Sequence, residues 1–336
     1  MTTDDITLGV VGLGLIGGSV ARGWLERTGR GVVAWTRSPA TRAQAAAQGV
    51  TIASSVADVI DRSDVVILAT PLAALGDTLA EAAAAGRSRS EPPTLTDVGS
   101  VKAPLHDLAR RVLPDPSIFV PGHPMAGTEH AGWLSADPDL FRDRKWALVV
   151  DAPVDLRRWS AVSDVALTLG SSVVPVAATD HDRAVALVSH LPHLIAAALR
   201  SLLATEPTSL GASLAAGSFS GATRVTSGAG RALGAEMAWT NRREAVTRID
   251  QLVAELGRQR SALESGDPQT LARLFPTDAL DPGHDRPDPT SLAVTRSGLL
   301  ALGRRGGLVV GHEGSGRVTV RDPGSGRDVV TAEAGA

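Results

Sequence analysis

The sequence predicts an α/β protein with a Rossmann-type, doubly wound and mostly parallel sheet, followed by an all-helical second domain. Three observations lead to this fold class. Short β-branched runs alternate with alanine-rich stretches over the first half of the chain, a glycine-rich turn follows the first of these runs, and the β pattern stops after about residue 180. A chain of 336 residues is also long enough to build two cores.

The predicted strands are short runs rich in valine, isoleucine and leucine. They are ITLGVVG (6–12), GVVAWT (31–36), DVVILAT (64–70), PTLTDVG (93–99), SIFVPG (117–122) and WALVVD (146–151). Strands that alternate with helical stretches in this way predict a parallel sheet with helices on both faces. We therefore place the first domain at residues 1–177.

Helical patterns dominate from about residue 180 to residue 275, so we place a helical domain at residues 178–275. Breaks are predicted at TEPTS (205–209) and at GSFSGATRVTSGAG (217–230). Its excess of alanine and leucine suits tight helix packing within the chain or between two copies, and we favour a homodimer through this domain. Residues 276–336 begin as a Pro/Asp-rich linker and continue as a short β-like or partly disordered tail.

Composition limits the classes of partner. The net charge of −3 is spread over mixed signs, which argues against nucleic acid and against a membrane surface. The absence of cysteine excludes disulfides, thiolate catalysis and cysteine metal sites. The N-terminus does not resemble a signal peptide, and the apolar stretch 184–204 contains two histidines, a proline and an arginine, which indicates a buried helix. We expect a soluble, cytoplasmic protein whose partner is a small molecule or another copy.

The glycine-rich turn predicts a dinucleotide site. Gly12, Gly14 and Gly17 have the G-x-G-x-x-G spacing between a predicted strand and a predicted helix. Such glycines permit a tight turn, close approach of the backbone to a pyrophosphate, and close packing of helix on strand. The predicted cofactor contacts also include Leu15 and Ile16 in this turn, and Thr70 at the end of the third predicted strand. A purely structural glycine turn is the alternative.

The end of the second predicted strand bears on the choice of cofactor. NAD enzymes usually place a carboxylate there to bind the ribose hydroxyls, but this chain has Thr36, Arg37 and Ser38. Hydroxyls and a guanidinium suit a 2′-phosphate, so we favour NADP over NAD. The alternative is that Arg37 only begins a solvated helix, in which case NAD is held by the backbone and hydroxyls.

Six motifs occur together in a fixed order. They are GLGLIGGS (12–19), DVGSVK (97–102), GHPMAG-x-E-x-x-G (122–132), LFRDRKW (140–146), SHLPH (189–193) and F-x-x-x-TR (219–224). In this order and spacing the chain resembles the prephenate dehydrogenase family, tyrosine-pathway enzymes that include arogenate dehydrogenases, from about Leu8 to Arg248. The resemblance implies oxidative decarboxylation of prephenate to 4-hydroxyphenylpyruvate with NAD(P)⁺, or of arogenate to tyrosine.

The expected catalytic residues are His123 and Ser100. Such a reaction needs a proton acceptor for a ring hydroxyl, and a histidine is suited to this because its pKa lies near neutrality. His123 matches the family's catalytic histidine, and Gly122 and Pro124 would fix its backbone; a histidine that satisfies backbone groups in a tight turn is the alternative. Ser100 matches an active-site serine that can orient the histidine, and it equally suits a helix N-cap.

The resemblance implies four substrate-binding residues. Arg224 would bind a substrate carboxylate, Glu129 would lie near Arg224 across the domain cleft, and at least one of His190 and His193 would line the pocket. A surface arginine, a loop acid and a core or capping histidine are the alternatives. The H-x-x-H pair without a third ligand is poor zinc geometry, so we expect no metal.

Between Phe219 and Arg224 the chain departs from its expected relatives. Many of them carry RDM there, whereas this chain has Ser220, Gly221 and Ala222. Because the ammonium of arogenate calls for a nearby carboxylate in a shielded pocket, the missing acid favours prephenate.

Three rival functions would each leave a different sequence signature. A β-hydroxyacid dehydrogenase would lack the GHPMAG segment. A non-catalytic dinucleotide sensor would bind the cofactor without turnover. A serine hydrolase built on Ser100, His123 and Asp97 would lack the G-x-S-x-G elbow. Asp97 and Lys102 themselves are expected to form a local ion pair or to be solvated.

Overall fold

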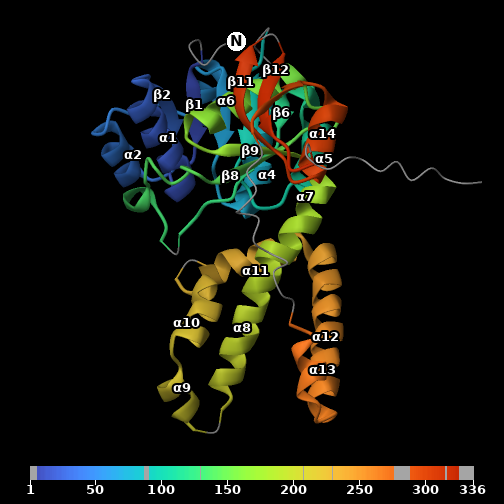
Figure 1. The fold of residues 1–336 in the computed structure, drawn as a ribbon. Helices are drawn as coiled ribbons and strands as arrows, with labels where there is room; N and C mark the ends of the chain where they lie inside the picture. The colour runs from blue at the N-terminus through green and yellow to red at the C-terminus, as the bar shows by residue number, and fades with distance from the viewer. Residues whose placement is uncertain are drawn as a thin grey trace, which may run out of the picture.

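The first sheet of the molecule is fully parallel. The structure is a computed structural model that describes residues 6–86, 91–128, 130–206, 208–228, 230–275, 288–314 and 316–324 (Figure 1). In spatial order the sheet contains β3 (Thr51–Ile52), β2 (Val32–Trp35), β1 (Leu8–Val11), β4 (Val65–Leu68), β5 (Thr94–Asp97) and β6 (Phe119–Val120). The order 3-2-1-4-5-6 is that of dinucleotide-binding folds and confirms the predicted fold class.

Helices cover both faces of this sheet. They are α1 (Leu15–Thr28), α2 (Pro39–Ala46), α3 (Val56–Asp61), α4 (Leu72–Gly86), α5 (Ala103–Val112) and α6 (Leu156–Thr168). One apolar cluster joins the sheet to α1 and α6 through Trp24 and Trp159, both fully buried. A second cluster joins the opposite face to α3, α4 and α5. Each strand is therefore buried on two sides, which is why the strands read as continuous apolar runs.

A second sheet continues the first and is mixed. Its spatial order is β10 (Thr290–Ala293), β12 (Arg317–Arg321), β11 (Leu308–Gly314), β9 (Ser172–Val176), β8 (Lys145–Val149) and β7 (Gly122–Pro124). Only β8 and β9 run parallel. The short 3₁₀ helices η2 (Pro116–Ile118) and η3 (Trp133–Ser135) lie in the loops of this region.

The C-terminal segment is part of this second sheet rather than a separate tail. β11 pairs with β9 through Val309 and Val173, and α14 (Arg296–Arg304) packs on β9 so tightly that a Cβ on Gly303 would lie 1.7 Å from Pro175 O. Arg296 fixes the segment by donating to Val154 O at 2.7 Å. Residues 276–287 and 325–336 lie outside the described residues, so the linker prediction there is untested.

The remaining helices form the second half of the molecule, below the sheets in Figure 1. They are α7 (Ala178–Val185), the π-helix η4 (Ala186–His190), α8 (Leu191–Ala204), α9 (Leu210–Leu214), α10 (Gly217–Thr223), the 3₁₀ helix η5 (Arg224–Thr226), α11 (Gly230–Thr240), α12 (Arg242–Glu264) and α13 (Pro268–Ala272). The break predicted at 217–230 is wrong in its first part, because α10 forms there. Thr223 Oγ1 donates to Phe219 O at 2.9 Å, which stabilises this short helix from within.

The helix Ala178–Ala204, which runs through α7, η4 and α8, is long and apolar enough by length and composition to cross a membrane. Only 28% of its most apolar window is buried, so the prediction of a buried helix is wrong for the single chain. The reason is that α10, α11 and η5 contact α8 while part of its apolar surface, including Leu202, stays open.

Candidate active site

The glycine-rich turn lies between β1 and α1. Gly12 has φ +100°, and a Cβ on it would lie 2.6 Å from Ala69 O; a Cβ on Gly17 would lie 1.9 Å from Gly12 O. These two glycines are required by the packing of the turn itself. Gly14 is different, because a Cβ there would meet nothing within 4 Å among the described residues. Gly14 therefore leaves space at the N-terminus of α1, where a phosphate approaches the backbone in such folds.

The start of α1 fits a dinucleotide. The residue that caps α1 is Gly14, which has no side chain to bind the first amides of the helix, so among the described residues no side chain competes with a phosphate for the amides at Leu15 and Ile16. Thr70 follows β4, directly beside the Gly12 turn, and its Oγ1 lies 3.0 Å from Thr78 Oγ1. When bound, NAD(P)⁺ would supply a hydride acceptor at this edge of the sheet.

Thr36, Arg37 and Ser38 follow β2, at the same edge. Ser38 caps α2, since its Oγ accepts from Thr41 N at 3.2 Å. Its hydroxyl proton remains able to donate to a ligand. Arg37 is exposed one residue before this cap, so both the predicted helix start and the predicted phosphate contact are compatible with its position.

His123 lies on β7, where it pairs with Ala147 of β8. The alternative of a tight turn at His123 is therefore wrong, because the residue lies in a short strand. A Cβ on Gly122 would lie 2.8 Å from Asp97 O, so a larger residue would push β7 away from the end of β5. His123 itself is 9% exposed.

One residue of α7, His181, contacts the imidazole of His123, and its neighbour Asp182 contacts His181. His123 Nδ1 lies 2.9 Å from His181 Nε2, and His181 Nδ1 lies 2.8 Å from Asp182 Oδ1. The carboxylate of Asp182 also caps α5, accepting from Lys102 N at 2.8 Å and from Ala103 N at 2.9 Å. The three side chains form one buried line from α5 to β7.

Ser100 lies in the loop between β5 and α5 and is half-buried. Its side chain makes no hydrogen bond to another described residue, and α5 begins at Ala103, three residues later. The helix N-cap interpretation of Ser100 is therefore wrong, because Asp182 supplies the cap. A bond from Ser100 to His123 is also absent from the described residues, so its place in the site remains a prediction.

Lys102 and Asp97 form a fully buried ion pair, and the alternative of solvated charges is wrong. Lys102 Nζ donates to Asp97 and, at 2.5 Å, to Gly122 O. Asp97 Oδ1 accepts from Gly122 N at 3.1 Å. The pair thus joins β5, the start of α5 and the residue before His123. Burial raises the pKa of Asp97 and lowers that of Lys102.

Burial also governs the three histidines of the cluster. It holds the pKa of His123 well below 6.5, and the nearby His181, Lys102 and His190 lower that pKa further. It lowers the pKa of His181 despite the carboxylate of Asp182, and it lowers the pKa of His190 to about 4. At neutral pH all three rings are neutral, so His123 can accept a proton.

His190 and His193 flank the start of α8 and contact different residues. His190 is fully buried and its Nδ1 lies 3.3 Å from Asn241 Nδ2, which also donates to Asp182 O at 2.8 Å. His193 packs against α11, because a Cβ on Gly234 would lie 2.6 Å from His193 Nδ1. Neither His190 Nε2 nor His193 Nδ1, both buried, has a hydrogen-bond partner among the described residues. Their contact with substrate remains a prediction.

The remaining substrate-binding predictions concern Arg224 and Glu129. Arg224 is exposed at the start of η5, which packs against α8. Glu129 lies outside the described residues. An additional acid crosses the domain junction: Glu236 of α11 accepts from Ala73 N at 2.5 Å, at the start of α4.

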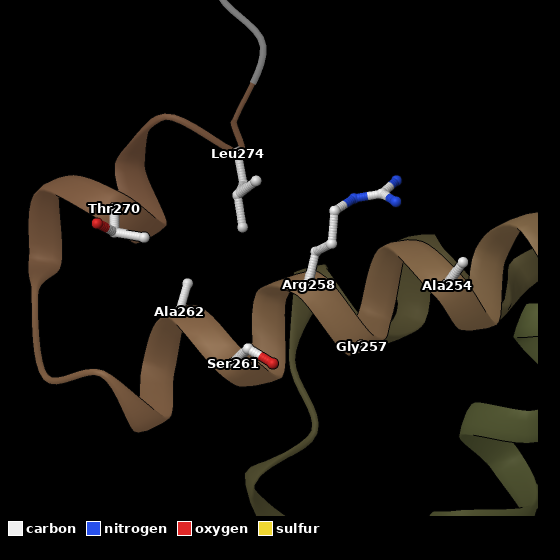
Figure 2. Close-up of a pocket in the computed structure, with 7 residues that line it drawn as sticks. All are labelled: Ala254, Gly257, Arg258, Ser261, Ala262, Thr270 and Leu274. Atoms are coloured by element: carbon white, nitrogen blue, oxygen red, sulfur yellow. The ribbon is translucent and has the colours of Figure 1, made fainter.

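Other parts of the described structure offer less chemistry. A hollow of about 630 Å³ lies between α12 and α13 (Figure 2), lined by Ala254, Gly257, Arg258, Ser261, Ala262, Thr270 and Leu274. It contains no histidine or carboxylate and is not a candidate active site. Over the described residues, no three histidine or acidic side chains converge as metal ligands.

Sequence reasoning missed His181, Asp182 and Asn241, and it left Lys102 outside the site. A signal for the first two was present: TDHD (179–182) follows the β-branched run SSVVPV of β9, at the carboxyl end of a strand where such folds bind their ligands. Asn241 carried no comparable signal, because it lies 59 residues from its partner Asp182.

Comparisons with known proteins agree with this geometry. A family model described as the nucleotide-binding domain of prephenate dehydrogenase matches residues 22–174, and one described as its dimerization domain matches residues 177–277. The chain is 30% identical over 274 residues to cyclohexadienyl dehydrogenase of Zymomonas mobilis, covering 80% of this chain and 92% of the relative.

Two solved structures are similar to the whole two-domain arrangement. Arogenate dehydrogenase of Synechocystis is 28% identical with a TM-score of 0.69, and 80% of this chain and 95% of that chain are covered. Prephenate dehydrogenase of A. aeolicus, in complex with hydroxyphenyl propionate and NAD⁺, is 26% identical with a TM-score of 0.72, and the coverage is 81% and 94%.

Proposed function

The chain belongs to the prephenate dehydrogenase family and is an NAD(P)-dependent oxidoreductase, and we propose that its substrate is prephenate, which it converts to 4-hydroxyphenylpyruvate for tyrosine biosynthesis. In this reaction a hydride leaves the ring carbon that carries the hydroxyl group. The ring then loses carbon dioxide, and the electron pair of the broken bond completes the aromatic ring.

The observation that carries this proposal is the neutral, buried imidazole of His123 at the carboxyl edge of the sheet. The hydroxyl proton must leave as the hydride does, and a neutral imidazole can accept it. Once carbon dioxide has gone, the same imidazole can return the proton to the phenolate oxygen. A rigid strand and the buried Lys102–Asp97 pair hold this base in place, which favours a near-attack arrangement.

Substrate choice is proposed from Arg224 and the segment before it. A guanidinium suits a substrate carboxylate through two parallel charge-assisted hydrogen bonds. Ser220, Gly221 and Ala222 offer no carboxylate for an ammonium group, which supports prephenate. Arogenate is the second candidate, because Glu236 places a carboxylate at the domain junction, although it is already bound to Ala73 N. In either case Ser100, His190, His193 and Glu129 are proposed to complete the substrate site.

For the cofactor we propose a preference for NADP⁺ over NAD⁺. It rests on Arg37 and the hydroxyls of Thr36 and Ser38 after β2, where an acid for the ribose is lacking. Arg37→Ala should weaken NADP⁺ binding about tenfold and leave NAD⁺ binding nearly unchanged, since one charge-assisted hydrogen bond contributes about 1.5 kcal/mol. Equal effects on both cofactors, measured by fluorescence titration, would contradict the preference.

We also propose that the enzyme is a soluble, cytoplasmic homodimer. The support is the dimerization-domain match over residues 177–277 and the open apolar surface of the same helices. A second copy on this surface would cover the apolar face of the helix Ala178–Ala204, which the single chain leaves exposed.

The decisive experiment is a four-way comparison of initial rates with prephenate or arogenate and with NADP⁺ or NAD⁺. We expect the highest kcat/KM with prephenate and NADP⁺. His123→Asn should lower kcat by about 10³-fold, within the range of general-base effects, with cofactor affinity retained. Turnover with arogenate alone would overturn the substrate proposal, and cofactor binding without any turnover would indicate a sensor.

A further inference from the structure

His123, His181 and Asp182 form a line of hydrogen bonds. His181 and Asp182 come from the helical half of the molecule. We propose that His181 and Asp182 are positioning residues that hold His123 in the one neutral tautomer whose Nε2 carries a lone pair. The proposal rests on the proposed function of His123 as proton acceptor. It concerns how that histidine is prepared before the substrate arrives.

The proton positions follow from the ends of the line. An ionised carboxylate can only accept hydrogen bonds, so the atom 2.8 Å from Asp182 Oδ1, His181 Nδ1, must carry a hydrogen. A neutral His181 then has its lone pair on Nε2. His123 Nδ1, 2.9 Å away, must therefore be the N–H donor. The hydrogen of a neutral His123 is thus on Nδ1, and Nε2 is left as the acceptor.

Asp182 is bound as an acceptor at the start of α5. Its two oxygens accept from the backbone amides of Lys102 and Ala103, the first donors of that helix. A carboxylate at a helix N-terminus is stabilised by these amides and by the helix dipole. Asn241 donates to the backbone carbonyl of Asp182 and so fixes α7 at the same point. Asp182, at the acceptor end of the line, is therefore held by three hydrogen bonds.

The other end of the line is open. His123 Nε2 makes no hydrogen bond within the described residues, yet it is not among the buried polar atoms that lack a partner. It is therefore reachable from solvent, in keeping with the 9% exposure of the residue. A substrate hydroxyl can reach the lone pair that the line prepares.

The charged and titratable groups around His123 come from four elements. Asp97 ends β5, Lys102 precedes α5, His181 and Asp182 belong to α7, and His190 ends η4. Lys102 is paired with Asp97, and among the described carboxylates near His123, Asp182 is the one that accepts from a ring nitrogen of the line. Because α7 directly follows β9 and leads into the helical half, the base on β7 is aligned only when α7 is docked.

The first test removes the acceptor for His123 Nδ1. His181→Leu should lower kcat for prephenate by about 10²-fold, since the wrong tautomer offers a hydrogen instead of a lone pair, while KM and NADP⁺ affinity change by less than about threefold. His181→Gln should recover part of kcat, because its amide oxygen can accept from Nδ1. His106→Leu is the matched control: it removes another buried histidine, on α5, and should leave kcat within about twofold. A His181→Leu enzyme with wild-type kcat would overturn the proposal.

The second test does not depend on turnover. Long-range ¹H–¹⁵N correlation spectra of the full chain with ¹⁵N-labelled histidine report which ring nitrogen carries the hydrogen, and His123→Asn identifies the signals of His123. We expect a protonated Nδ1 and an unprotonated Nε2 at pH 7.5, with mixed tautomers in His181→Leu. A hydrogen on Nε2 in the wild-type chain would overturn the proposal. If prephenate were not turned over but the Nδ1–H tautomer were found, the proposed function would fail while the positioning role stood.

Discussion

The two halves of the molecule differ in how completely the single chain buries its apolar side chains. In the α/β half, Trp24, Trp146 and Trp159 are each at most 1% exposed. In the helical half, Val253, Leu263 and Trp239 are 62%, 65% and 72% exposed. The exposed large apolar residues of α12 follow a 3-4-3-7 spacing, at Val246, Ile249, Val253, Leu256 and Leu263. That spacing forms a stripe of the kind that packs on another helix.

This difference in burial shows which half of the molecule keeps the site rigid. The cofactor turn and the strand of His123 lie in the half that is complete in one chain, so their geometry is fixed by a closed core. The second half contributes α7, whose His181 and Asp182 contact the completed half directly. A helical half that leaves this much apolar surface open in the single chain can still orient the base, because α7 is anchored on α5.

The sharpest test of this comparison replaces one tryptophan in each half by alanine. Trp159→Ala should lower the free energy of unfolding by about 3–5 kcal/mol, since it empties a closed core. Trp239→Ala should change it by less than about 0.5 kcal/mol in the monomer. Urea unfolding at a protein concentration below dimer dissociation measures both. A large loss for Trp239→Ala would break the comparison, because it would mean that the monomer buries this side chain.

The pH dependence of stability should come from the cluster between the two halves. Burial lowers the pKa of His190 from 6.5 to about 4, so the unfolded chain binds a proton more readily between these values. The contribution is therefore complete above pH 6.5 and is lost as the pH falls toward 4, by at most about 3 kcal/mol. Urea midpoints between pH 7.5 and 4.5 measure it. His190→Gln should flatten the slope, and an unchanged slope would place the dependence elsewhere.

A charge on the apolar stripe of α12 tests whether a second copy completes the helical half. Val253→Asp should raise the dimer dissociation constant by about 10- to 100-fold, since an interface must then bury an unpaired carboxylate. Gln251→Asp, on the opposite face of α12, is the matched control and should dimerise normally. Sedimentation at a series of concentrations reports both. Equal behaviour of the two variants would exclude this stripe from the interface.

The smallest effect is expected at the cofactor turn, where the complete half meets its ligand. Gly14→Ala should leave the free energy of unfolding unchanged within about 0.5 kcal/mol, because a Cβ there meets no described atom within 4 Å. It should weaken dinucleotide binding about tenfold by blocking close approach to the backbone. Thermal unfolding and fluorescence titration separate the two. Full cofactor affinity would show that the pyrophosphate does not pass over Gly14.

The repeating parts of the fold could be predicted because their signals are local. Each strand of the parallel sheet is buried on both faces, so a run such as DVVILAT reveals β4 without any partner. The two-residue β3 is too short to show a pattern. The sequence did not place the strands β10 to β12. They join the second sheet through the pairing of β11 with β9, which are more than a hundred residues apart in the chain.

The candidate site divides in the same way. His123, Ser100 and the glycines belong to local motifs and could be named from the sequence. The partner of His123 could not, since His181 is 58 residues away and an adjacent His–Asp pair is common in any chain. The serine expected as a helix cap also failed, because the cap of α5 comes from α7 and not from the local sequence.

The sequence by itself determined the α/β class, the order of its motifs and the identity of the proposed base, because strand periodicity, turn glycines and motif spacing are encoded within a few residues. Only the tertiary structure decided that Lys102 is buried, that Asp182 caps a helix of the other half, and which nitrogen of His123 faces the solvent. Those properties depend on hydrogen bonds and burial between segments far apart in the chain. These contacts form only when the segments pack together, so no local sequence pattern predicts them.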